Sequence, residues 1–245
     1  MSLFITGTDT GVGKTRVAAM LVRALRAAGV DAVGFKPICC GGREDAELLA
    51  AASGGAVALN DVNPVWLRPP VAPYTAAMIE GRMVDVALVR EKFAQLRAAH
   101  AAVIVEGAGG WLVPVTRDFS MADLAIEFAL PVLVVAANRL GVINHTLLTV
   151  AAIRAGGLRC AGVILNQVQP PADDDAAVVT NAGVLGELLG VLPGGAVPLL
   201  GELEFGAKIL PPTLSKSTRP ECCLWPLAAD MRDVMISEGI SKSHF

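Results

Sequence analysis

The sequence contains few aromatic residues, only 4% of the total, although 53% of its 245 residues are hydrophobic. Its mean hydropathy of +0.56 first raises the question of a membrane protein. A spanning helix needs about 18 or more nearly unbroken apolar residues, and no stretch meets this requirement. The best candidate, 182–200, contains Glu187, Pro193 and Pro198. The hydrophobicity comes instead from Ala, Val and Leu, which is typical of helices packed on a buried parallel sheet.

The sequence also lacks an excess of positive charge and a cysteine framework. It has 20 Lys and Arg against 23 Asp and Glu, for a net charge of −3, whereas nucleic-acid-binding proteins usually present a basic surface. Its 5 cysteines have neither a zinc-ligand spacing nor the even count of a secreted disulfide scaffold. The first residues contain no basic segment leading into an apolar core, so we expect no signal peptide. We therefore predict a cytoplasmic protein with no nucleic-acid or membrane partner.

Short apolar runs alternate along the chain with longer segments of helical periodicity. This alternation predicts βαβ units, and hence an α/β fold with a mostly parallel sheet, right-handed crossovers and helices on both faces. We find no internal repeat and no linker long enough to separate two domains, so we predict a single domain over residues 1–245. The expected strands are 2–6, 31–36, 102–105, 131–136, 160–165 and 196–200, and the expected helices are 13–28, 44–52, 74–80, 84–100, 144–155, 174–189 and 227–236.

The clearest motif, GTDTGVGKT at 7–15, lies between the first expected strand and the helix that follows. It ends in the Gly-Lys-Thr of the P-loop pattern G-x-x-x-x-G-K-[ST], with Thr8 in place of the first glycine. Backbone N–H groups of such a turn bind phosphate oxygens, and the helix dipole favours their charge. Lys14 would reach the β- and γ-phosphates, and the Thr15 hydroxyl would bind Mg²⁺. The motif therefore predicts a P-loop NTPase-like fold.

Three further polar residues stand where expected strands end or an expected helix begins. Ligands of open α/β sheets bind beyond the carboxyl ends of the strands, where Glu106 and Lys36 are placed. Glu106 can hold a metal ion together with Thr15, and Lys36 can neutralise a transferring phosphoryl group; each residue taken alone also suits a solvated strand end. Asp45 is either a metal ligand or a favourable charge in the first helical turn, and its position alone favours the second role.

Together these segments resemble the dethiobiotin synthetase family. The resemblance extends from Ser2 to about Gln167, and the family's loop also has threonine where Thr8 stands. The matching motifs are GTDT and VGKT in the loop, FKP at 35–37, NP at 63–64, Pro70, AP at 72–73, EGR at 80–82, VEGAGGW at 105–111, AD at 122–123, LGVINH at 140–145, LLT at 147–149 and GVILN at 162–166. Their order and spacing make the resemblance far more specific than a phosphate loop alone.

The resemblance implies an ATP-dependent cyclo-ligase of biotin biosynthesis, with Mg²⁺ as cofactor. Such an enzyme converts 7,8-diaminononanoate, CO2 and ATP into dethiobiotin, ADP and phosphate, through a carbamate and a carbamic-phosphoric anhydride. The resemblance also implies a homodimer with the substrate site at its interface.

Roles for individual residues follow from the same resemblance. Those implied in the chemistry are Thr15, Asp45 and Glu106 as Mg²⁺ ligands, Lys14 and Lys36 as cations that stabilise the carbamate and the transferring phosphoryl group, and Thr10 at the reacting end of the substrate. Those implied in nucleotide binding are Gly11, Val12, Gly13, Lys14, Thr15, Arg16, Asp45, Glu106, Gly107, Ala108 and Gly109, with Asn166, Gln167 and Glu204 at the adenine. Those implied in substrate binding are Cys40 and the helix start at Gly141, Val142, Ile143 and Asn144, which receives the substrate carboxylate across the dimer interface.

Two features depart from the family pattern. Family members commonly have Ser or Thr where Cys40 stands, and a thiol is a poorer hydrogen-bond donor than a hydroxyl. The chain from about residue 206 onward does not match the family pattern.

Two other classes of ATPase share the phosphate loop. Amide-forming ATPases of the cobyrinate type carry an added glutaminase domain with a cysteine nucleophile, for which we expect no room in 245 residues. Regulatory ATPases of the ParA/MinD type bind DNA or membrane and have a further lysine early in the loop, whereas residues 7–13 contain no lysine. Residues 230–244 mix charges of both signs, which is unfavourable for a membrane anchor.

Overall fold

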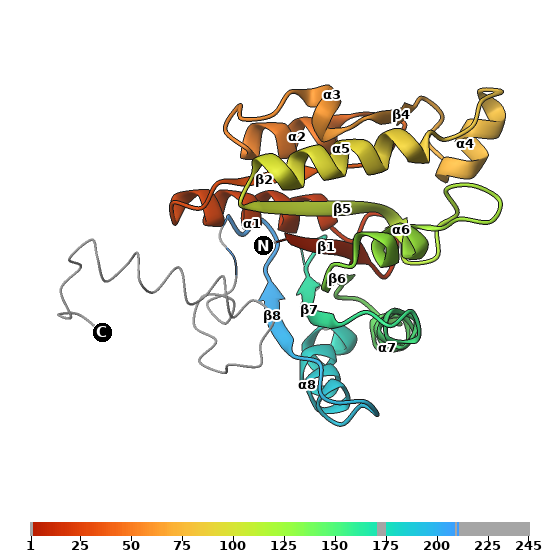
Figure 1. Ribbon diagram of the computed structural model, residues 1–245. Coiled ribbons are helices and arrows are strands. Elements are labelled where there is room, and N and C mark those ends of the chain that lie inside the picture. Colours follow the sequence, from red (N-terminus) through yellow and green to blue (C-terminus); the bar gives the residue numbers. More distant parts are fainter. Residues whose placement is uncertain (1, 171–174, 209, 211–245) are drawn as a thin grey trace.

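Six parallel strands form the central sheet of the computed structural model (Figure 1), in the order β2-β5-β1-β6-β7-β8. The structure describes residues 2–170, 175–208 and 210. The six strands are β1 (Ser2–Gly7), β2 (Ala32–Phe35), β5 (Ala102–Gly110), β6 (Val132–Ala137), β7 (Cys160–Asn166) and β8 (Leu199–Leu203). Most of their residues are buried, as in parallel sheets covered on both faces. The predicted α/β class with a parallel sheet is confirmed.

Helices cover both faces of this sheet, as predicted. On one side, α1 (Lys14–Ala27) and α2 (Glu44–Ala52) share a hydrophobic core with Leu3 and Ile5 of β1. On the other side, Phe4 of β1 belongs to a second core. Successive residues of a strand point to opposite faces, so one strand contributes to both cores. The helices that pack in the second core are α5 (Val86–Ala99), α6 (Met121–Phe128), α7 (Val142–Ala155) and α8 (Ala176–Gly190).

A second, two-stranded parallel sheet was not predicted. It pairs β3 (Ile38–Cys40) with β4 (Val65–Leu67), and two short helices, α3 (Leu59–Val62) and α4 (Pro73–Ile79), lie near it in the sequence. A strand of three residues is too short to show an alternating pattern, and the neighbouring prolines favoured a loop. Only α4 was expected, at 74–80.

Most of the other predicted elements begin and end within two residues of the observed ones, with three exceptions. The prediction for β5 was too short, because the glycine-rich end continues to pair with β1 as far as Gly110. β8 lies three residues further along than expected, at Leu199–Leu203. α6 was missed, although Ser120 and Asp123 form a capping box at its start. The expected helix 227–236 lies outside the described residues.

Among the helices of the described residues, none is both long and apolar enough to cross a membrane.

Candidate active site

The phosphate loop joins β1 to α1 at the carboxyl edge of the sheet. Gly13 precedes the first helical residue and has φ +91°, a conformation that favours glycine. A Cβ at this position would lie 2.1 Å from Nδ2 of Asn166, so a larger residue does not fit there. No side chain caps the start of α1. Its first backbone N–H groups can therefore serve an anionic ligand.

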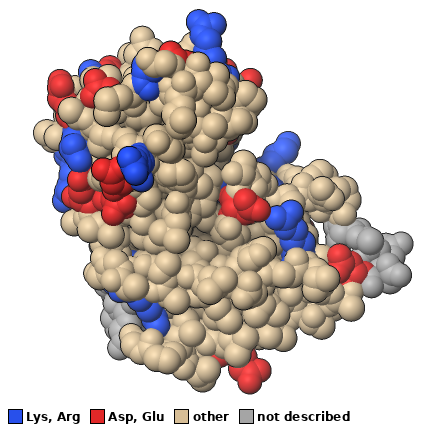
Figure 2. Space-filling view, turned by 90° about the vertical axis from the view of Figure 1, so that its right-hand side faces the viewer, with Lys and Arg blue, Asp and Glu red and all other residues tan. Residues whose placement is uncertain are grey.

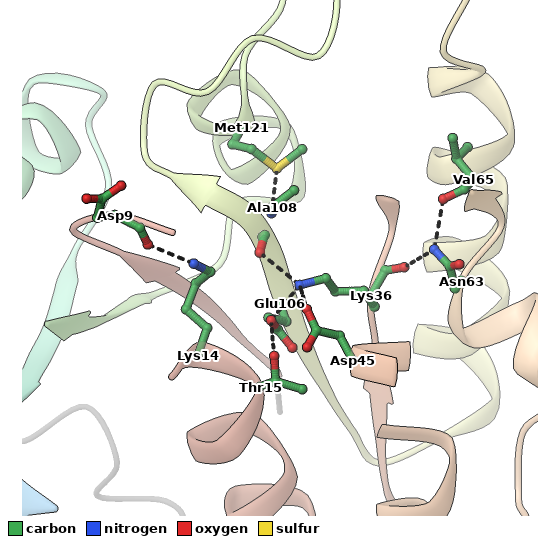
Figure 3. Close-up of polar contacts among 11 residues, drawn as sticks. Asp9, Lys14, Thr15, Lys36, Asp45, Asn63, Val65, Glu106, Ala108 and Met121 are labelled. Atoms are coloured by element: carbon green, nitrogen blue, oxygen red, sulfur yellow. Dashed lines mark hydrogen bonds and ion pairs between the residues drawn. The ribbon is translucent and has the colours of Figure 1, made fainter. Parts of the chain in front are cut away.

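Lys14 is the first residue of α1 and is 6% exposed. Its Nζ donates a hydrogen bond to the backbone oxygen of Asp9 at 3.0 Å (Figure 3). Burial, together with the nearby positive charge of Lys36, lowers the pKa of Lys14 to about 8. A phosphate anion beside Lys14 would favour its charged form and raise this pKa again, so the position suits phosphate.

Lys36 lies at the centre of the site, between two carboxylates. Its Nζ is 2.5 Å from Oε1 of Glu106 and 3.0 Å from Oδ2 of Asp45 (Figure 3). Burial opposes the charge of Lys36, but Glu106 and Asp45 outweigh it and raise the pKa of Lys36 above its ordinary value. Partial burial likewise opposes the charge of Asp45, whose side chain is 50% exposed, but Lys36 and the hydroxyl of Thr15 together lower the pKa of Asp45. Lys36 is therefore a permanent cation at neutral pH.

Asn63 holds the backbone of Lys36 in place, a role that the sequence did not reveal. Its Nδ2 donates to the backbone oxygen of Lys36 and to that of Val65, each at 2.9 Å, and it is 2% exposed. It thereby ties the end of β2 to the start of β4. Asn63 belongs to the NP motif at 63–64, which was the available signal, but the motif carried no indication of its role.

The oxygen atoms around Lys36 form a donor set that fits Mg²⁺. The Thr15 hydroxyl donates to Oε1 of Glu106 at 2.8 Å, while Oε2 of Glu106 is buried and has no hydrogen-bond partner in the described part of the chain. Hydroxyl and carboxylate oxygens are the hard ligands that Mg²⁺ prefers. The described residues hold no cluster of three His, Cys, Asp or Glu suited to a metal, so a metal here would need the threonine as well as both carboxylates.

Asn166 and Arg16 mark the other end of the site. Asn166, the last residue of β7, donates from Nδ2 to the backbone oxygen of Val12 at 2.9 Å. Arg16 reaches Oδ1 of Asn166 at 3.0 Å and the backbone oxygen of Glu204 at 2.8 Å. Gln167 is held to the end of β8 through its backbone N–H. The structure thus brings Asn166, Gln167 and Glu204 close to the phosphate loop.

The remaining sequence-predicted residues are spread around this centre. Thr10 is exposed on the loop. Cys40 ends β3 half-buried, and burial raises the pKa of its thiol to about 11. Gly141, with φ +92°, precedes α7, so the predicted helix start at 141–144 is confirmed, whereas its role in binding a carboxylate stays a prediction.

Arg139, in the loop between β6 and α7, was missed by the sequence analysis. Its Nη2 lies 3.3 Å from Oδ2 of Asp9 in the phosphate loop. The signal that could have found it is its position two residues after the carboxyl end of β6, on the edge where ligands bind.

The strand–loop–helix at Gly13 and the parallel sheet define a P-loop nucleotide-binding protein. MinD, a cell division ATPase of Pyrococcus furiosus, has a similar fold, with a TM-score of 0.51 at 16% sequence identity over 97% of this chain and 98% of that protein. A family model described as an AAA domain matches residues 1–213.

Curated relatives give the particular family. The ATP-dependent dethiobiotin synthetase BioD of Akkermansia muciniphila is 44% identical over 205 residues, which cover 84% of this chain and 92% of that protein. The ATP-dependent dethiobiotin synthetase BioD of Anaeromyxobacter dehalogenans (strain 2CP-C) is 49% identical over 212 residues, covering 85% and 94%. The chain belongs to the ATP-dependent dethiobiotin synthetase family. The predicted family, ligase class and ATP dependence are confirmed.

Proposed function

We propose that this protein forms dethiobiotin from 7,8-diaminononanoate, CO2 and ATP in the cytoplasm. The observation that carries the proposal is the position of Lys36, a buried permanent cation between Glu106 and Asp45 beside the phosphate loop. The family supplies the identity of the substrates. The geometry supplies the fixed cation that the reaction requires, because an anionic carbamate must approach an anionic triphosphate.

The reaction has three steps. One substrate amine captures CO2 as a carbamate, and a carbamate oxygen then attacks the γ-phosphorus of ATP, which releases ADP and forms a carbamic-phosphoric anhydride. The second amine attacks the carbonyl carbon, closes the ureido ring and releases phosphate. Carbamate and triphosphate repel each other, so fixed cations lower the barrier to their approach. Holding both amines near the reacting carbon lowers it further.

Two lysines of this chain supply the fixed positive charge. Lys36 remains protonated because its carboxylate neighbours raise its pKa, so it acts as a cation and not as a base. Lys14, at the start of α1, faces the region that the β- and γ-phosphates would occupy. Thr10, exposed on the loop, would contact the reacting end of the substrate, and Cys40 would border it from β3.

Thr15, Asp45 and Glu106 would hold Mg²⁺. When bound, the ion supplies positive charge to the phosphate oxygens. The buried Oε2 atom of Glu106, which has no hydrogen-bond partner among the described residues, supports this assignment.

The nucleotide would bind at the start of α1, and a substrate carboxylate would bind at the start of α7. Backbone groups of residues 11–16 and 107–109 would surround the triphosphate, while Asn166, Gln167 and Glu204 would border the adenine. The N-terminus of α7 at 141–144 would bind the carboxylate of a substrate that occupies the active site of the partner subunit.

Exposed hydrophobic side chains support the proposed homodimer. Leu112, Leu140 and Leu148 are 70%, 86% and 61% exposed. Figure 2 shows that the side of the molecule carrying α4, α6 and α7 has large areas without charged side chains. Large exposed hydrophobic side chains on a surface with few charges are typical of association sites.

The test is to measure dethiobiotin formation and phosphate release with and without diaminononanoate plus bicarbonate. We expect phosphate release to require both, with one dethiobiotin formed per phosphate. Phosphate release that needs neither substrate, or that responds to DNA or lipid vesicles, would contradict the proposal and favour a regulatory ATPase. Light scattering across a concentration series tests the dimer separately.

A further inference from the structure

The side chain of Arg16 joins three segments that are distant in the sequence. It follows the phosphate loop directly, on the first turn of α1. Nη1 donates to Oδ1 of Asn166 at 3.0 Å, and Nη2 donates to the backbone oxygens of Glu204 and Ala207 at 2.8 and 2.6 Å. One guanidinium therefore connects α1, the end of β7 and the turn after β8, because its donors form a fixed planar fork.

These contacts fix the orientation of the Asn166 amide. Oδ1 accepts from Arg16, and Nδ2 donates to the backbone oxygen of Val12 at 2.9 Å. Rotating the amide by half a turn would bring two donors together at Arg16 and two acceptors together at Val12. An amide oxygen has two lone pairs and an amide nitrogen two hydrogens, so each atom keeps one hydrogen-bonding position unused. Asn166 is 1% exposed, so a base reaches these positions only if neighbouring side chains move aside.

A fixed amide discriminates between purine bases. Adenine presents a donor at N6 and an acceptor at N7, whereas guanine presents acceptors at O6 and N7. An amide that offers an oxygen acceptor beside a nitrogen donor matches adenine and places two oxygens against each other for guanine. Free rotation of the amide would remove part of this discrimination.

The turn after β8 is held against the same part of the loop. Ala207 and Leu210 pack against the hydrophobic core that contains Val12 and Val17, and Arg16 supplies the polar contacts to this turn. Its three hydrogen-bond acceptors are neutral protein oxygens. The guanidinium therefore binds the protein segments that are proposed to border the adenine, and it is not directed at the proposed phosphate site.

We infer that Arg16 is a positioning residue that selects adenine nucleotides, by fixing the Asn166 amide and the 204–207 turn around the base. This inference rests on the proposed placement of the adenine at Asn166. It assigns to the side chain of Arg16 a role distinct from the backbone contact with phosphate.

Equilibrium binding of ATP, GTP and inorganic tripolyphosphate, each with Mg²⁺, tests the inference in wild type, Arg16→Ala and Arg16→Lys. Tripolyphosphate has no base, so it reports on the phosphate loop alone. We expect Arg16→Ala to lose about tenfold in ATP affinity relative to tripolyphosphate, the scale of one charge-assisted hydrogen bond, with a similar fall in the ATP:GTP preference. Lys has a single ammonium and cannot bridge the three segments, so Arg16→Lys should also lose preference.

Arg154→Ala is the matched control. Arg154 also donates to two backbone oxygens, those of Pro193 and Gly195, but at the end of α7, and its loss should leave the binding ratios unchanged. Equal losses for ATP and tripolyphosphate, or an unchanged ATP:GTP preference, would overturn the inference, as would unfolding of both Arg16 variants by circular dichroism. The assay needs no diaminononanoate. A wild type that prefers ATP but forms no dethiobiotin would contradict the proposed function and leave the role of Arg16 intact.

Discussion

Nζ of Lys36 lies 2.5 Å from Oε1 of Glu106, although the two residues are 70 positions apart in the sequence. β2 and β5 are neighbours in the sheet, which brings their carboxyl ends together. Both side chains are almost fully buried, and burial is favourable for such a pair only when each charge is compensated. The pair therefore holds the ammonium group of Lys36 in a fixed position next to the phosphate loop before any ligand binds.

Replacing this cation should separate catalysis from nucleotide binding. We expect Lys36→Gln to lower turnover at least about 100-fold, the typical effect of removing an electrostatic contact to the transition state. ATP should still bind, because the loop itself is unchanged. Initial rates of dethiobiotin formation and calorimetric ATP titration provide the measurements.

The control for Lys36 is Lys92→Gln, which removes a partly exposed lysine paired with Asp61 at 2.7 Å. This variant should keep its activity and fold. If Lys36→Gln instead loses its thermal unfolding transition, Lys36 is structural and its assigned role in catalysis is wrong.

The close approach of Gly13 to Asn166 makes Gly13→Ala a severe change. Its new Cβ would collide with Nδ2 of Asn166, so ATP binding should be lost and the melting temperature lowered. Gly29 has a similar φ of +80° but open space around it, and Gly29→Ala should cost only about 1 kcal/mol, from the left-handed backbone. Equal losses in both variants would show that the backbone conformation matters and the contact with Asn166 does not.

A substitution at Asp45 tests whether this residue is a metal ligand or only a favourable charge in the first turn of α2. If it binds Mg²⁺, Asp45→Asn should raise the Mg²⁺ concentration needed for half-maximal activity by at least about tenfold, because the loss of even an outer-shell partner of a metal site costs about 10- to 100-fold. Glu44→Gln, which changes the neighbouring exposed acid in the same helical turn, should not. An Mg²⁺ titration of initial rates compares the two variants. Matching titrations for Asp45→Asn and the wild type would assign Asp45 to the helix dipole alone.

The lowered pKa of Lys14 predicts a pH dependence of ATP affinity. In the free protein its pKa is about 8, and phosphate binds the protonated amine. Affinity should therefore be full below about pH 8 and fall above it, by up to about tenfold for each pH unit. Calorimetry between pH 7.5 and 9.5, where the triphosphate is already ionised, measures this fall. A flat profile would show that Lys14 stays charged without ligand.

The raised pKa of Cys40 predicts that its thiol reacts slowly with alkylating reagents. Burial moves its pKa from 9 to about 11, which lowers the thiolate fraction about 100-fold at pH 8, and the thiolate is the reacting form. Iodoacetamide labelling of the Cys40 peptide, followed by mass spectrometry, should be correspondingly slow and should rise with pH up to about 11. Labelling as fast as that of a free cysteine would place the thiol in water.

The sequence by itself determined the local chemistry and the class of fold. Residues 7–15 contain the glycines, lysine and threonine of a phosphate loop within a few positions of one another, and the apolar runs are long enough to indicate buried parallel strands. The helix at 44–52 was predicted with its observed ends, because a helix is formed by contacts between residues that are only three or four positions apart in the sequence.

Only the tertiary structure decided which distant residues meet. The sequence placed Lys36, Asp45 and Glu106 near one edge, but their individual roles stayed open, and it gave no sign that Arg16 would contact Asn166, 150 positions away. The order of the strands and the direction of each crossover set these contacts, and hydrophobic periodicity encodes neither. The buried oxygen of Glu106, the position of Asn63 and the pairing of β3 with β4 likewise depend on packing between segments that no local pattern connects.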